Sequence, residues 1–210
     1  MMHTGDRTDP APAATPSPRP TPPRYLPRAI PPAALSELRD RDDAGNALRP
    51  FVVADPSAPL DAEGSPLRCC LRSARAGERI ALVSYAPLRR WAAAHKVDPG
   101  AYDEVGPVFV HAEPCPGPEL SGAMAEYPHA RTGALRTLRR YDDRGQLLGG
   151  ALLEIPADAT AGFDSAIDEA FADPAVALVH IRALEHGCFQ FAVERPAPEE
   201  VPHPRPSPSS

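Results

Sequence analysis

Several features that mark specialised classes of protein are missing from this sequence of 210 residues. No apolar run approaches the roughly 20 residues that a membrane-spanning helix needs, so we expect no membrane partner. The first residues lack the charged and then apolar pattern of a secretory signal, which predicts a cytoplasmic protein. The formal net charge is −6, with acidic and basic residues interspersed, and this balance argues against a nucleic-acid-binding surface.

Cysteine is scarce, and its spacing matches no common motif. The four cysteines stand at positions 69, 70, 115 and 188. They form neither a Cys-x-x-Cys pair nor the pattern of a small disulfide-rich scaffold. We therefore interpret Cys69, Cys115 and Cys188 as small buried residues of an intracellular protein.

Proline, in contrast, is abundant, with 29 residues concentrated towards the two ends of the chain. Such segments bury too little apolar surface to offset the entropy of ordering them. We predict a disordered or polyproline II extension over residues 1–47, with a helical turn over 32–38, and a disordered tail over 196–210. Residues 48–195 then form a single domain.

Within this domain, short apolar runs alternate with turn residues. They predict strands over residues 51–54, 67–71, 80–85, 106–112, 135–141, 146–154, 176–181 and 188–193, and helices over 87–96 and 163–171. In the second helix, Phe163, Ile167 and Phe171 are spaced four residues apart and form one apolar stripe. A polar turn ending in glycine joins two of these strands into a hairpin. Hairpins dominate and strands and helices do not alternate regularly, which predicts an α+β fold: a largely antiparallel sheet with one or two helices packed on it.

The strand predicted over residues 106–112 carries the greatest concentration of chemically reactive side chains. Side chains on a strand alternate between its faces, so Phe109 and His111 share one face while Val108 and Val110 share the other. Glutamate and cysteine follow shortly after the strand. This concentration of reactive side chains does not by itself make the strand end an active site.

Several short motifs along the domain occur in a characteristic order. They lie at residues 106–111, 115, 139–142, 171–174, 180–182 and 187–189. In this order and spacing, across roughly residues 67–195, they resemble a bacterial family named domain of unknown function 1203. The resemblance supports the domain boundaries. The family carries no established activity, cofactor or catalytic residue, so the cofactor stays unknown and the question of an enzyme stays open.

Two predicted strands carry polar side chains suited to an anion. Alternation places Arg139 and Tyr141 on one face of their strand, and His180 and Arg182 on one face of another. If both sets face the same side of the sheet, their guanidinium groups suit a carboxylate or a phosphate. We interpret the domain as a binding module for an anionic small molecule or peptide. The alternative is that the arginines form ordinary salt bridges on a solvated face.

Two other functions remain open. A small enzyme would use Cys188 as a nucleophile, or His111 with His180 for acid–base work. A metal-binding domain would draw zinc ligands from these residues together with Cys115 and His186, but no paired ligand spacing is present. We therefore predict no metal site, and we place His111 and Cys188 with the four anion-binding candidates as the residues to locate in the structure.

Overall fold

The computed structural model describes residues 22–55, 57, 64–118 and 126–196. Most of the predicted tail after residue 195 and the first part of the predicted extension lie outside these described residues. The disorder of those segments stays a prediction.

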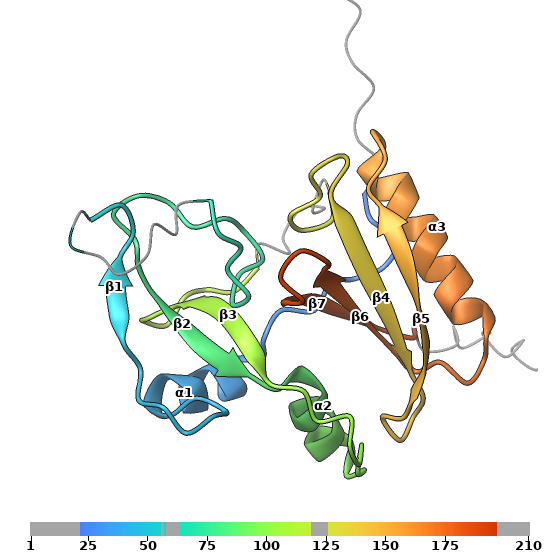
Figure 1. Ribbon diagram of the computed structural model, residues 1–210, viewed down its shortest axis with the longest axis horizontal. Helices are drawn as coiled ribbons and strands as arrows, with labels where there is room; N and C mark the ends of the chain where they lie inside the picture. The colour runs from blue at the N-terminus through green and yellow to red at the C-terminus, as the bar shows by residue number, and fades with distance from the viewer. Residues whose placement is uncertain (1–21, 56, 58–63, 119–125, 197–210) are drawn as a thin grey trace, which may run out of the picture.

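The described residues form three helices and seven strands (Figure 1). The helices are α1 (Pro32–Asp40), α2 (Pro87–His95) and α3 (Ala159–Ala172). The strands are β1 (Pro50–Val52), β2 (Arg79–Tyr85), β3 (Gly106–His111), β4 (Leu135–Tyr141), β5 (Leu147–Glu154), β6 (Leu178–Ala183) and β7 (Phe189–Glu194). All strand pairs are antiparallel, which confirms the α+β class.

The strands form two sheets where the sequence predicted one. One sheet has the order β1-β2-β3 and the other the order β5-β4-β6-β7. Figure 1 shows the first sheet with α1 and α2 in one half of the molecule, and the second sheet with α3 in the other. The second edge of β3 does not pair with β4, because a loop occupies it through a parallel bridge between Leu67 and Phe109. The strand predicted over residues 67–71 is this loop, which turns at Leu71 with a φ of 57°.

The helix α3 covers one face of the four-stranded sheet and forms its core. The Asp158 side chain caps the helix by accepting a hydrogen bond of 3.0 Å from the Ala161 backbone nitrogen. The predicted stripe of Phe163, Ile167 and Phe171 is buried. It packs against side chains from β4, β6 and β7, including Leu138, Ile181 and Phe191. Polar residues, among them Arg139, His180 and Arg182, lie on the opposite face of this sheet.

The segment over residues 22–47 differs from the sequence prediction of a disordered extension. Arg28 forms an isolated antiparallel bridge with Ala192 of β7. The helix α1 then buries Leu35 and Leu38 in the core beside the three-stranded sheet. The prediction of disorder rested on the proline content and gave too little weight to these few apolar residues. Their burial offsets the entropy cost of ordering the segment.

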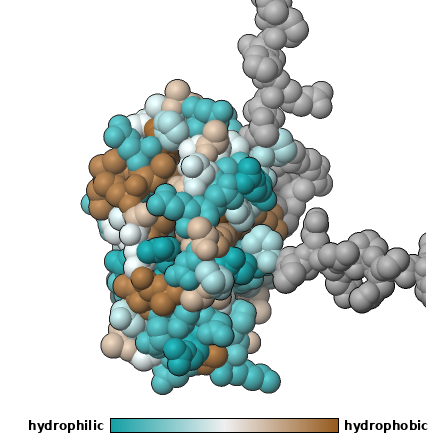
Figure 2. All heavy atoms as spheres, turned by 90° about the vertical axis from the view of Figure 1, so that its right-hand side faces the viewer, coloured by the Kyte–Doolittle hydropathy of each residue, from teal (hydrophilic) through white to brown (hydrophobic). Residues whose placement is uncertain are grey.

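Within the described part of the chain, no helix combines the length and the apolar composition needed to cross a membrane. On the face drawn in Figure 2, hydrophobic side chains form separate patches between hydrophilic ones.

Candidate functional site

Four donor atoms meet beside the end of β3. The sulphur atoms of Cys69, Cys70 and Cys115 and a ring nitrogen of His111 all lie within 4.8 Å of one another. Cys69 and Cys70 are buried, while His111 and Cys115 are partly buried. This group, which we call the sulphur cluster, unites two segments about forty residues apart in the sequence.

The local fold explains why these residues meet. The Arg68 backbone nitrogen donates to the Phe109 carbonyl at 2.9 Å, which holds the 64–75 loop along β3. The same register brings the Cys69 sulphur to 3.3 Å from the His111 backbone nitrogen, which donates a hydrogen bond to it. Because β3 ends at His111, the chain is free to turn, and Cys115 comes back to the cluster.

The three distances among Cys69, Cys70 and His111 are close to those of a tetrahedral zinc site, and Cys115 lies within 4.8 Å of all three. The two adjacent sulphurs of Cys69 and Cys70 are 3.9 Å apart. His111 Nδ1 is 3.3 Å from the Cys69 sulphur and 3.8 Å from that of Cys70. Zinc bonds of about 2.3 Å to sulphur and about 2.0 Å to nitrogen, at tetrahedral angles, give about 3.8 Å between sulphurs and about 3.5 Å between sulphur and nitrogen. The side chains therefore need little movement to hold an ion.

The two adjacent thiols do not ionise independently. The Cys69 thiol donates a hydrogen bond to Cys70, which lowers the pKa of Cys70. The same hydrogen bond, together with burial, raises the pKa of Cys69. Cys70 is therefore the first of the pair to become a thiolate, which is the form that binds metal.

An ion pair between Arg72 and Glu78 lies beside the His111 imidazole. Arg72 donates to both oxygens of Glu78, at 2.6 and 3.0 Å, and this pairing lowers the pKa of Glu78 to about 2. His111 Nε2, on the side of the ring opposite Nδ1, lies 3.2 Å from Arg72 Nη2 and 3.7 Å from Glu78 Oε2. Because a guanidinium can only donate, the contact with Arg72 makes Nε2 the accepting nitrogen and leaves the ring proton on Nδ1, while Glu78 lies just beyond hydrogen-bond distance.

A cavity gives access to the sulphur cluster. It has a volume of about 530 Å³, and both Cys69 and Cys115 contribute to its lining. The rest of the lining is mostly apolar and comes from the segment around α1 and from the loop after β3. A buried metal site needs an entry path of this kind.

Four of the predicted anion-binding residues lie together on the four-stranded sheet. Arg139 of β4 is directly opposite His180 of β6, so both side chains project to the same face. The Tyr141 and His180 rings are 5.0 Å apart between centroids. Arg182 lies one pair further along the same face, opposite Thr137. The structure therefore brings these four residues to one side of the sheet, away from α3.

The two arginines of this group share one carboxylate. Arg182 Nη1 is 2.9 Å from Glu104 Oε2, and Arg139 Nη1 bonds Glu104 Oε1. Glu104 belongs to the connection between α2 and β3. We call Glu104, Arg139 and Arg182 the arginine cluster. An internal carboxylate occupies the position that the sequence analysis assigned to an external anion.

His180 is unsuited to proton transfer near neutral pH. It is 1 % exposed, and burial, together with Arg182 and Arg139, lowers its pKa to about 3. Its imidazole is therefore uncharged at pH 7. Among the described residues, its Nδ1 has no hydrogen-bond partner.

The other two predicted residues lie elsewhere. His111 belongs to the sulphur cluster. The Cys188 sulphur contacts the His186 carbonyl at 3.5 Å, in the turn between β6 and β7. Within the described ranges, Cys188 makes no hydrogen bond with His111 or His180, so the catalytic pair suggested by the sequence is not formed there. The sulphur–imidazole contact that the structure does contain is the one between Cys69 and His111.

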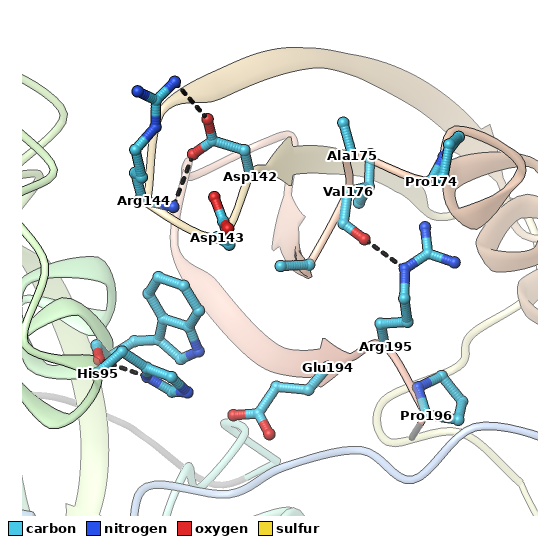
Figure 3. Close-up of a pocket in the computed structure, with 12 residues that line it drawn as sticks. His95, Asp142, Asp143, Arg144, Pro174, Ala175, Val176, Glu194, Arg195 and Pro196 are labelled. Carbon is cyan, nitrogen blue, oxygen red and sulfur yellow. Dashed lines mark hydrogen bonds and ion pairs between the residues drawn. The ribbon is translucent and has the colours of Figure 1, made fainter. Parts of the chain in front are cut away.

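Another cavity involves neither cluster. It has a volume of about 850 Å³ and lies between α2, the β4–β5 turn and the end of β7 (Figure 3). Two of its charged groups have partners: Arg144 is 3.5 Å from Asp142, and Arg195 Nε donates to the Val176 carbonyl at 2.7 Å. Trp91 Nε1, also in the lining, has no hydrogen-bond partner among the described residues. The convergent set of metal-ligating atoms found in the described part of the chain is the sulphur cluster.

Comparison with known proteins agrees with the resemblance seen in the sequence. Residues 64–195 match the family described as protein of unknown function (DUF1203), and the chain belongs to this family. No curated protein and no solved structure matches the chain. The matched region contains every residue of the sulphur cluster and of the arginine cluster.

Proposed function

We propose that this DUF1203 protein binds a divalent transition-metal ion, with zinc as the best fit, through the sulphur cluster. The observation that carries the proposal is the meeting of three thiols and one imidazole within 4.8 Å. Thiolate and imidazole are the preferred zinc ligands, and a set of three cysteines and one histidine is an established tetrahedral combination. Four protein ligands leave no open position, which favours a structural or storage role over a catalytic one.

The surroundings of the sulphur cluster support a bound cation. Three thiolates around a divalent ion carry a net charge of −1, and the Arg39 guanidinium, whose Nε donates to the His111 carbonyl at 3.3 Å, offsets it. Binding at His111 Nδ1 requires the ring proton to move to Nε2 and the Arg72 guanidinium to turn away from that nitrogen, so that Glu78, now 3.7 Å away, can accept the proton. Binding also releases the thiol protons, so metal affinity increases with pH.

The test is a competition titration of the reduced, full-length protein with zinc and a chromophoric chelator. We expect one zinc per chain, and at least a hundredfold weaker binding in the double variant C69S/C70S. Replacing zinc with cobalt should give the absorption bands of a tetrahedral thiolate site.

The matched control is C188S, which removes a partly buried thiol outside the cluster and should keep the affinity of the unmodified protein. Equal zinc affinity in the unmodified protein and C69S/C70S would overturn the proposal.

A second function, the binding of an anionic small molecule, is favoured by the arginine cluster. Arg182 is buried and Arg139 is partly buried, and both point at one carboxylate position. A cavity of about 540 Å³, lined in part by Arg139 and Tyr141, lies on this face of the sheet. Guanidinium pairs held on neighbouring strands suit a carboxylate or a phosphate.

The test of this second function is calorimetric titration of the unmodified protein with benzoate and with inorganic phosphate. We expect one of them to bind, and the variant R139A to bind it at least tenfold more weakly. Failure of the unmodified protein to bind either probe would count against anion binding.

A further inference from the structure

We infer that Glu104 is an internal occupant of a carboxylate-binding site, and that an external monocarboxylate with a small apolar body binds by displacing it. The inference rests on the second proposed function, anion binding at the arginine cluster. It adds the class of ligand and the contact that regulates its access.

The geometry at Glu104 is that of a carboxylate bridging two guanidinium groups. Oε1 bonds Arg139 and Oε2 lies 2.9 Å from Arg182. Each oxygen therefore has its own arginine, an arrangement that any carboxylate reproduces. The resident group thus defines the ligand class.

The charges at the arginine cluster are unbalanced. Two guanidiniums face one carboxylate, and the Arg182 side chain is 7 % exposed while that of Glu104 is 44 % exposed. Burial tends to raise the pKa of Glu104, but the arginines outweigh this effect and the pKa is lowered. Glu104 is therefore ionised at neutral pH and competes with any anion for the same donors.

In the contact between Glu104 and the two arginines, the arginines are held more firmly than Glu104. Arg139 and Arg182 project from β4 and β6, the two inner strands of the four-stranded sheet. Glu104 lies in an irregular stretch before β3, with exposed residues Tyr102 and Val105 on either side. Displacement therefore moves the exposed Glu104 side chain, while the arginines stay in place.

The cavity beside the arginine cluster has room for the body of a ligand. Its volume is about 540 Å³, and its lining includes Glu104, Arg139, Tyr102 and Leu152. Gly150 is directly opposite Arg139 in the β4–β5 register, so no β5 side chain fills the space beside the guanidinium. Aromatic and aliphatic walls with a few polar groups are typical of small-molecule sites.

The experiment measures benzoate binding by calorimetry at pH 7 and low salt, using the full-length chain. We expect Glu104→Gln to bind benzoate at least tenfold more tightly than the unmodified protein, because the competing charge is gone. The double variant E104Q/R139A should lose this gain. The matched control is Glu113→Gln, which removes an exposed carboxylate that pairs with Arg79 and does not line the cavity; it should behave as the unmodified protein.

The outcomes separate the inference from the anion-binding function on which it rests. If the unmodified protein binds benzoate and E104Q binds it no more tightly, the role of Glu104 is overturned and anion binding stands. If neither binds benzoate or phosphate, both are overturned. Tighter binding of phosphate than of benzoate by E104Q overturns the carboxylate class. Circular dichroism checks the fold of E104Q, and Glu104→Ala, which also removes the charge, is read in the same way.

Discussion

The sulphur cluster and the arginine cluster show two ways of arranging polar side chains on a β-sheet. In the sulphur cluster, thiols and an imidazole that all donate electron pairs surround a common point. In the arginine cluster, cations already bond an internal carboxylate. Electron-pair donors that converge on one point indicate a site for a cation that the chain itself does not supply. Arginines already bonded to a carboxylate of the same chain indicate a site that a ligand can occupy only by displacing that carboxylate.

The largest expected effect tests whether the two halves depend on the same core. Phe163 is fully buried between α3 and the four-stranded sheet. Phe163→Ala should lower the free energy of unfolding by about 3–5 kcal/mol, because it leaves a cavity in that core. Urea denaturation measures this loss. Leu152→Ala, at a position on β5 that is 62 % exposed, is the control and should change stability little.

Zinc affinity in the same Phe163→Ala variant sharpens the comparison. The sulphur cluster belongs to the other half, so under conditions where the variant is folded its affinity should stay within a fewfold of normal. A parallel loss of stability and affinity would mean that the two halves form one inseparable core.

An intermediate effect is expected at Glu78. Glu78→Gln should weaken zinc binding about 10- to 100-fold, because the neutral amide supports the His111 ring proton less well than a carboxylate does. The same chelator competition measures this change. Glu113→Gln is the control, since Glu113 pairs with Arg79 at an exposed position near the cluster. An unchanged affinity in Glu78→Gln would remove Glu78 from the metal site.

The smallest expected effect is on acid stability of the metal-free protein. Arg72 lowers the pKa of Glu78 from an ordinary value of 4.5 to about 2. The folded state therefore holds its proton less tightly than the unfolded state, so the stability from this pair is complete above pH 4.5 and is lost as the pH falls towards 2. Unfolding midpoints measured between pH 5 and 2 should fall more steeply in the unmodified protein than in Glu78→Gln. Equal slopes would contradict this assignment.

Local patterns predicted much of the fold. Alternation in β4 and β6 was enough to put Arg139 and Arg182 on one face, because both strands are regular where they pair. The spacing of Phe163, Ile167 and Phe171 similarly identified α3. These features depend on neighbours within a few residues along the chain.

The sulphur cluster was missed because it depends on contacts distant in sequence. Cys69 and Cys70 looked like part of a strand, whereas they lie in a turn closed by Leu71 in the left-handed region. Nothing local indicates that this turn packs on β3, 40 residues later. The nearest available signal was the strand ending at His111 with Cys115 close behind. The division into two sheets was missed for the same reason.

The segment before α1 lies outside the region matched by the family, yet it contacts both halves of the molecule. We therefore expect the part of the chain that unfolds as one unit to be longer than the matched region. Ile30 donates its backbone N–H to the Arg68 carbonyl in one half, while the Tyr25 ring lies 5.6 Å from that of Phe171 in the other. A chain trimmed to the family match at residue 64 would lose this segment and expose the aromatic surface that Tyr25 covers at Phe171. We expect such a fragment to aggregate, whereas one that begins before Arg24 should stay monodisperse.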